Sequence, residues 1–249
     1  MKLGVNIDHV ATLRQLRATP YPSVLEAAEI CARAGAEQIT VHLREDRRHI
    51  QDEDVRLLRR KLKIALNLEM AVAEPIVKMA LKLQPDWACL VPEKRQELTT
   101  EGGLNVRSQA VKVKSVVARL KRVGIRVSLF VEPDIRTVRL SAEIGADAVE
   151  LHTGRYAGLT QARKVNEKAI KRELERIYAA AVAGREAGIH VHAGHGLDAQ
   201  NVQALAALVD SQGQEMIEEY NIGHYLVCRS VEVGLFRAVQ EMRSAILAP

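Results

Sequence analysis

The stretch KLGVNIDHVATLRQLR, residues 2–17, decides between two folds that are built from parallel strands. Its first part, residues 2–8, has the composition of a buried strand. A doubly wound open sheet usually carries a glycine-rich fingerprint directly after its first strand. Residues 6–17 contain no glycine, so the sequence favours the alternative, a closed barrel.

Seven further strand-like runs follow, and an amphipathic helical segment comes after each run. The predicted strands cover residues 2–8, 38–43, 65–70, 87–93, 126–132, 147–154, 190–196 and 218–223. The predicted helices cover residues 24–35, 54–62, 74–83, 111–124, 134–145, 160–186, 201–209 and 231–247, with a short extra helix at 223–231. This alternation predicts an α/β fold, a single (β/α)₈ TIM barrel over residues 1–249, with its active site at the C-terminal ends of the strands.

The composition excludes several other classes of protein. The chain has 249 residues, of which 47% are hydrophobic and 27% charged, as in an ordinary globular protein. Its net charge of +5 suits anionic ligands, but with only 3% aromatic residues it does not resemble an RNA-binding protein. The sequence shows neither a signal peptide nor an apolar run long enough to span a membrane, and its three cysteines have no metal or redox spacing. We therefore expect a cytoplasmic protein that binds neither nucleic acid nor membrane.

Titratable residues gather where the predicted strands end. Seven of the eight histidines lie in or just beyond a strand, and His49, in a loop, is the eighth. In chain order the strands deliver Asn6, Asp8 and His9; His42 and Arg44; Glu69; Glu93, Lys94 and Arg95; Glu150 and His152; His190, His192 and His195; and Asn221, Gly223 and His224. Convergence of so many such groups on one rim of a barrel is typical of a site.

Two glutamates on this rim are difficult to explain as structural residues. Glu69 stands near the end of the apolar strand ALNLEM, and Glu150 lies in AVELHTG. Burying a carboxylate there is costly without a partner, and a raised pKa is the expected consequence. Such a group suits general acid–base catalysis.

Other rim residues have structural alternatives. His152 and His190 are interpreted as core histidines with a hydrogen-bond partner, and Asp8 could brace the loop after the first strand. Arg47 and Arg48, in the loop after the second strand, could simply be solvated.

Two glycine-containing motifs predict an anion site. AGHG, residues 193–196, and NIGH, residues 221–224, follow the last two strands, where barrels commonly bind phosphate with the help of a short helix. The helix expected at 223–231 would open at Gly223. A second anion site is expected from Arg44, His49 and Thr99, together with the loop TTEGG at 99–103.

These motifs together resemble one family, the pyridoxine 5'-phosphate synthases. The resemblance runs from the first strand to the last helix and rests on GVNIDHVATLRQLR, ITVHLREDRRHI, LNLEMA, CLVPEKRQELTTEGGL, VELHTG, HAGHGL and YNIGH. It implies condensation of 3-amino-2-oxopropyl phosphate with 1-deoxy-D-xylulose 5-phosphate to pyridoxine 5'-phosphate, with phosphate and water released. It also implies that the enzyme uses no cofactor and forms a homo-octamer. We further expect no metal, because the sequence shows no complete ligand set at metal spacing.

The resemblance further implies a role for individual residues. His42 and Glu69 would accept protons, His195 would donate one, and Glu150 would stabilise the transition state. The amino-ketone phosphate would be held by Asn6, Arg17, Gly196, Gly223 and His224, with Arg17 in the loop after the first strand. The sugar phosphate would be held by Asp8, His9, Arg44, His49 and Thr99.

Two other classes of function stay open from the residues alone. A metal-dependent hydrolase could use the paired histidines of HVH, residues 190–192, with His42, Glu69 and Glu150 as further ligands. Hydrolase barrels of that kind are expected to carry paired histidines on the first strand, where this chain has NIDH. A non-catalytic anion-binding barrel would leave Glu69 and Glu150 without a purpose.

Overall fold

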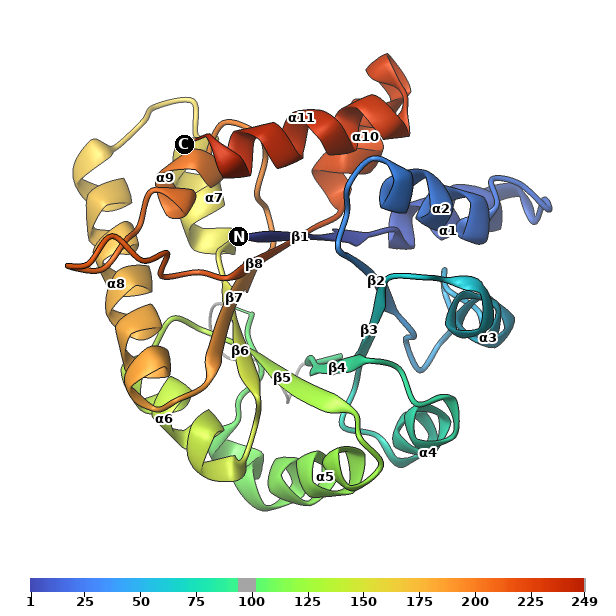
Figure 1. The fold of residues 1–249 in the computed structure, drawn as a ribbon, viewed down its shortest axis with the longest axis horizontal. Coiled ribbons are helices and arrows are strands. Elements are labelled where there is room, and N and C mark those ends of the chain that lie inside the picture. Colours follow the sequence, from blue (N-terminus) through green and yellow to red (C-terminus); the bar gives the residue numbers. More distant parts are fainter. Residues whose placement is uncertain (94–101, 249) are drawn as a thin grey trace.

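The computed structural model describes residues 1–93 and 102–248, and within them eight parallel strands close into a barrel in the order β1 to β8 (Figure 1). The strands are β1 Lys2–Asn6, β2 Gln38–His42, β3 Ala65–Met70, β4 Trp87–Leu90, β5 Arg126–Val131, β6 Ala148–His152, β7 His190–Gly194 and β8 Glu219–Ile222. The first and last strands pair in parallel, with Gly4 opposite Asn221, and this pairing closes the ring. The predicted TIM barrel is therefore confirmed.

Helices surround the ring of strands on its outer side (Figure 1). They are α1 Asp8–Arg17, α2 Val24–Arg33, α3 Asp52–Lys61, α4 Glu74–Leu83, α5 Ala110–Arg122, α6 Ile135–Ile144, α7 Gly154–Thr160, α8 Glu167–Glu186, α9 Val202–Ala206, α10 His224–Val233 and α11 Leu235–Leu247, with a 3₁₀ turn η2 Arg107–Gln109. None of these helices is both long enough and apolar enough to cross a membrane.

Three helices differ from the sequence-based prediction. The first strand ends at Asn6, because the Asn6 side chain accepts a hydrogen bond from the Asp8 backbone N–H at 2.9 Å and turns the chain into α1. Arg17 is therefore the last residue of a helix and not part of a loop. Likewise α7 was not predicted, and α8 begins at Glu167 because the side chain of Asn166 caps it, accepting the Ala169 N–H.

The barrel wall separates an apolar layer from a polar interior. Residues that point outward from the strands toward the helices are apolar and fully buried, such as Val41, Leu68 and Leu129. Alternate residues that point inward are polar and also buried; they include Gln38, Thr40, Asn67, Ser128, Glu150, His192, Glu219 and Asn221. Because side chains alternate along a strand, the same eight strands supply a hydrophobic core outside and a hydrogen-bonding interior inside.

Candidate active site

A cavity of about 830 Å³ opens at the C-terminal ends of the strands. Its walls receive residues from strand ends all round the barrel, and this volume lies in the range of pockets that bind small molecules. The predicted site residues that line it are Asn6, Asp8, His9, His42, Arg44, His49, Glu69, Glu150, His195, Gly196, Gly223 and His224. Two predicted residues are not among them: Arg17 lies exposed at the end of α1, and Thr99 lies outside the described residues.

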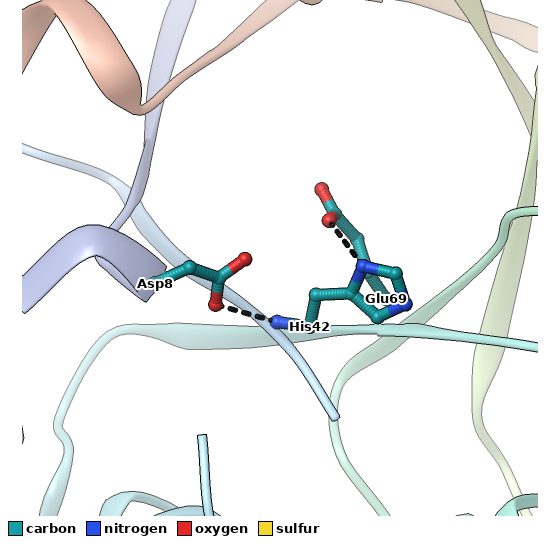
Figure 2. Close-up of side chains that lie close together, drawn as sticks. All are labelled: Asp8, His42 and Glu69. Atoms are coloured by element: carbon teal, nitrogen blue, oxygen red, sulfur yellow. Dashed lines mark hydrogen bonds and ion pairs between the residues drawn. The ribbon is translucent and has the colours of Figure 1, made fainter. Parts of the chain in front are cut away.

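Asp8, His42 and Glu69 form a compact cluster on one wall of the cavity (Figure 2). Asp8 accepts the His42 backbone N–H at 2.8 Å, so the loop after β1 is fixed to the end of β2. The His42 ring lies between two carboxylates: its Nδ1 is 3.8 Å from Glu69 Oε2, and its Nε2 is 3.0 Å from Glu93 Oε1. Asp8 therefore braces the loop after β1, as the structural alternative expected, and also lines the cavity.

Glu69 lies in surroundings that favour its protonated form. Burial raises the pKa of Glu69 well above its ordinary value, and the nearby carboxylates of Asp8 and Glu150 raise it further, against a hydrogen bond from Asn6. Burial also raises the pKa of Asp8, partly offset by the hydrogen bond from His42. A carboxylate of raised pKa next to a histidine can take up and return protons near neutral pH.

The three side chains of this cluster could also offer ligands to a divalent metal ion, since one atom of each lies within 4.8 Å of the others. Hydrogen-bond donors of the protein are already directed at the carboxylate oxygens of this cluster. The Asn6 amide donates to Asp8 Oδ2 at 3.0 Å and to Glu69 Oε2 at 3.5 Å, and the His42 N–H occupies the other Asp8 oxygen. Donors directed at the carboxylate oxygens suit proton transfer better than metal binding.

Arg44 and His49 form a polar end of the cavity. Nε of Arg44 is buried and has no hydrogen-bond partner in the part of the chain that the structure describes. Burial and the neighbouring His42 lower the pKa of His49 to about 4, so its ring is neutral at pH 7. Nδ1 of this ring accepts the Ile50 N–H at 2.8 Å, which leaves Nε2 to carry the proton and donate to a ligand. This end of the cavity can therefore bind an anion with one guanidinium and one neutral donor.

The other cationic residues of this loop take part in local pairs. The Arg47 side chain is 2.6 Å from Asp52, and the Arg48 side chain is 2.6 Å from Asp46. Neither arginine lines the cavity. The loop after β2 therefore places Arg44 and His49 in the cavity wall, and Arg47 and Arg48 stabilise the loop itself.

Two glycines form a second part of the cavity wall, the glycine end. Gly223 precedes α10, whose first N–H groups lie at the cavity wall, and a Cβ on Gly223 would come within 2.9 Å of the Asn6 Cβ. Gly196 has φ of +79°, and its Cβ would lie 2.7 Å from that of Ala157. Both positions therefore require glycine, and the N-terminus of α10 provides the backbone donors and partial positive charge that a phosphate needs. Both glycine motifs therefore contribute to the cavity wall, and the anion site that they predict stays a prediction.

A buried amide links two carboxylates below the cavity. Asn221 Nδ2 donates to Glu150 Oε2 at 2.9 Å and to Glu219 Oε1 at 3.3 Å. Its carbonyl oxygen accepts from Thr40 at 3.1 Å and from Gln38 at 3.4 Å, and these donors fix the orientation of the amide. Burial, followed by the charge of Glu219, raises the pKa of Glu150 to about 8.

Two histidines interpreted as core residues have different surroundings. His152 is buried and bonded to Glu132, as the structural interpretation predicted. The prediction for His190 is wrong: its side chain is 57% exposed at the N-terminal end of β7, where it pairs with Glu218 at 2.8 Å. His190 and His192 therefore do not form a cavity-facing pair, since His192 lies deep in the barrel near Glu219 at 3.6 Å.

Sequence reasoning gave no role to Asn221, Glu219, Glu93 or Glu132. Asn221 and Glu93 were noted at strand ends, but nothing in the sequence showed which carboxylate or histidine each would reach. One signal was available. Polar residues at every second position of β2, β6 and β8 indicate that the barrel interior, and not only its rim, is hydrogen-bonded.

Comparisons with known proteins agree with this geometry. The family model described as "Pyridoxal phosphate biosynthesis protein PdxJ" matches residues 3–248. A protein of Coxiella burnetii (strain RSA 493 / Nine Mile phase I) is 50% identical over 246 residues, which cover 99% of this chain and 98% of the relative. A protein of Magnetococcus marinus is 52% identical over 242 residues, covering 97% and 95%. Both relatives are named pyridoxine 5'-phosphate synthase.

Solved structures of more distant proteins share the fold. The 3-keto-L-gulonate-6-phosphate decarboxylase of Vibrio cholerae superposes with a TM-score of 0.65 at 11% identity, over 98% of this chain and 96% of that one. Thiamine phosphate pyrophosphorylase of Pyrococcus furiosus gives 0.58 at 15% identity, over 99% and 95%. At such low identity these likenesses show the barrel fold alone.

The raised pKa of Glu150 predicts a pH-dependent cost to stability. Because the folded protein holds this proton more tightly than the unfolded chain, ionising Glu150 destabilises the folded state as pH rises from 4.5 to about 8. Glu150→Gln lacks this ionisation. We expect the free energy of unfolding of the variant, relative to that of the unmodified protein, to increase with pH across that interval, by at most about 1.4 kcal/mol per pH unit. Urea unfolding at several pH values across the interval measures the gain.

The control for this measurement is Glu175→Gln, which changes an exposed glutamate of α8. Its stability curve should run parallel to that of the unmodified protein. If the Glu150→Gln curve runs parallel as well, the carboxyl group of Glu150 is ionised at neutral pH and the expected cost is absent.

Proposed function

The chain belongs to the PdxJ family of pyridoxal phosphate biosynthesis proteins, and we propose that it acts as a pyridoxine 5'-phosphate synthase. The proposed reaction joins 3-amino-2-oxopropyl phosphate to 1-deoxy-D-xylulose 5-phosphate and releases phosphate and water. One observation carries the proposal: the wall of a single cavity brings together an arginine, the glycines around the start of α10, and carboxyl and imidazole groups that can transfer protons. Ring closure between two phosphorylated carbonyl compounds needs groups that bind phosphate and groups that transfer protons.

Each proton-transfer group has surroundings that suit its proposed role. Glu69, with its raised pKa, is a stronger base than a solvated carboxylate, and His42 lies beside it to share the proton. His195 is proposed as the proton donor. Glu150, held in place by Asn221, is proposed to stabilise the transition state.

The two ends of the cavity are proposed to bind different phosphates. The amino-ketone phosphate is placed at the glycine end, against Asn6, Gly196, Gly223 and His224. The sugar phosphate is placed against Asp8, His9, Arg44 and His49, with Thr99 completing the set. The imine nitrogen of the reaction is proposed to come from the amino-ketone itself.

A metal-dependent hydrolase is the second candidate, and the Asp8–His42–Glu69 cluster is the observation that favours it. One assay separates the two functions. The purified protein is incubated with both phosphorylated substrates, with and without a chelator, and pyridoxine 5'-phosphate is followed by mass spectrometry. We expect product at the same rate in both samples. Loss of turnover with the chelator, restored by one added divalent ion, would favour the metal enzyme.

Glu69→Gln is expected to remove most turnover while the fold and substrate binding are kept. Glutamine preserves the shape and the hydrogen bond from Asn6 but cannot accept a proton at neutral pH. The loss of a general base lowers the rate by about 10²- to 10⁴-fold. The kcat and the thermal midpoint of the variant are measured together, and near-normal kcat with a lowered midpoint would assign Glu69 to structure.

We also propose that the protein acts in the cytoplasm as a homo-oligomer, an octamer by its resemblance to the family. Exposed apolar side chains support self-association. Leu13 and Leu16 of α1, the following Tyr21 and Val231 of α10 are 49%, 71%, 68% and 82% exposed. The helices α1 and α10 pack against each other, and we propose that a second copy covers these side chains. Figure 1 shows the two helices side by side at the outside of the barrel.

Arg17 is the exposed last residue of α1, directly after Leu16, and it does not line the cavity of its own chain. We propose that it reaches the cavity of a neighbouring subunit. Mixing Arg17→Ala with Glu69→Gln should then give more activity than the two variants assayed apart, because some cavities would receive Glu69 from one chain and Arg17 from the other.

Arg44→Ala is the matched control for this mixing experiment. Arg44 lines the same cavity as Glu69 of its own chain, so every mixed cavity would still carry one defect. Equal activity in both mixtures would show that Arg17 does not act between subunits.

A further inference from the structure

Glu132, just after β5, forms a buried pair with His152 at the end of β6. Its Oε1 lies 3.0 Å from His152 Nδ1 and also accepts the Gly103 N–H at 2.9 Å. Both side chains of the pair are at most about one tenth exposed, at 10% and 7%. Arg176 of α8 lies behind the carboxylate, 3.7 Å from its other oxygen. The imidazole of His152 is thus held with Nδ1 toward Glu132.

The fixed ring of His152 packs directly against His195. The two ring centroids are 4.8 Å apart, and the ring planes meet edge to face at 67°. The centroid of the Phe130 ring lies 5.0 Å from that of His152 and 6.2 Å from that of His195. The backbone contributes as well, since His195 has φ of +81°, a left-handed conformation that is rare for a side chain of this size. A Cβ on Gly154 would come within 2.7 Å of His152 Nε2 and 3.0 Å of His195 Cδ2, so the two rings leave no room for a side chain there.

We propose that Glu132 and His152 are positioning residues for His195. The carboxylate fixes His152, and His152 together with Phe130 fixes the His195 ring where it faces the cavity. This inference rests on the proposed function, in which His195 donates a proton. Neither Glu132 nor His152 lines the cavity, so they act only through His195.

The charges around His195 support this arrangement. Desolvation and then the neighbouring His152 lower the pKa of His195, and Glu132 acts in the opposite direction. Of the other charged groups nearby, Arg176 faces Glu132, and Asp198 lies in the wall of the same cavity. Glu132 therefore helps His195 to keep the proton that it is proposed to donate, while the orientation of the ring directs that proton into the cavity.

The test compares Glu132→Gln with the unmodified protein in two measurements. Diethyl pyrocarbonate modifies the neutral form of histidine, so its rate of reaction with His195, followed by mass spectrometry against pH, reports the midpoint of that titration. Removing the charge of Glu132 should move this midpoint to lower pH. In the turnover assay kcat should fall on the order of 10- to 100-fold while both KM values stay close to normal, and the fall of kcat at alkaline pH should begin earlier.

His152→Gln is a second variant with an opposite expectation. Glutamine can still donate to Glu132, but it removes the ring that lowers the pKa of His195, so the midpoint should move to higher pH while kcat again falls. This variant also decides the question if Glu132→Gln fails to fold. In a His195→Asn background, either change should have little further effect on kcat, because residues that act as one unit are not additive.

Glu218→Gln is the matched control, since it breaks another carboxylate–histidine pair, with His190 at 2.8 Å, at the opposite end of the barrel. It should leave both measurements unchanged. An unchanged His195 midpoint in Glu132→Gln and His152→Gln would overturn the inference, and so would shifted midpoints with normal kcat. If the unmodified protein makes no pyridoxine 5'-phosphate, the proposed function fails, and the midpoints alone still decide whether this pair controls His195.

Discussion

The strictest physical requirement of this barrel is a partner for the carboxylates buried in its interior, and the side-chain amide of Asn221 supplies it. Two carboxylates, Glu150 and Glu219, are buried in the interior, and each buried charge needs a partner or a proton. Asn221 donates to both, while Thr40 and Gln38 hold its carbonyl oxygen and prevent the amide from turning over. The same contacts join β8 to β2 and β6, so the network that satisfies the carboxylates also links these three strands through the barrel interior.

The two faces of the barrel wall divide stability from chemistry. Outward-pointing residues such as Ile39, Val149 and Val191 are fully buried against the helices, and burial of apolar surface there supplies the main favourable term in folding. The interior can then be polar without loss of the fold. This division explains how the fold tolerates carboxylates with raised pKa values. The free-energy cost of burying them is offset by the separate hydrophobic layer.

Much of the fold was predictable because the spacing of apolar residues within each short segment distinguishes a strand from a helix. The strand ends were predicted closely enough to collect most of the cavity wall. The helix α1 was missed because only Val10 and Ala11 of its apolar residues are buried, whereas Leu13 and Leu16 are exposed, so the segment shows no continuous apolar face. Pairings such as Glu132 with His152 depend on the register of β5 and β6 and on the path of residues 102–104, and neither can be read from spacing along the chain.

The cavity wall offers few formal positive charges for the phosphates that it is proposed to bind, and this bears on the proposed catalysis. Desolvation lowers the pKa of His9 and of His49, so both act at neutral pH as uncharged rings, and the glycine end relies on backbone N–H groups. Arg44 is the one arginine or lysine among the described residues that line the cavity. Phosphates bound as proposed would therefore bring more negative charge than this guanidinium neutralises. That charge would raise the pKa of Glu69 further, so a proton that the Glu69 carboxylate takes from a substrate would be held more tightly.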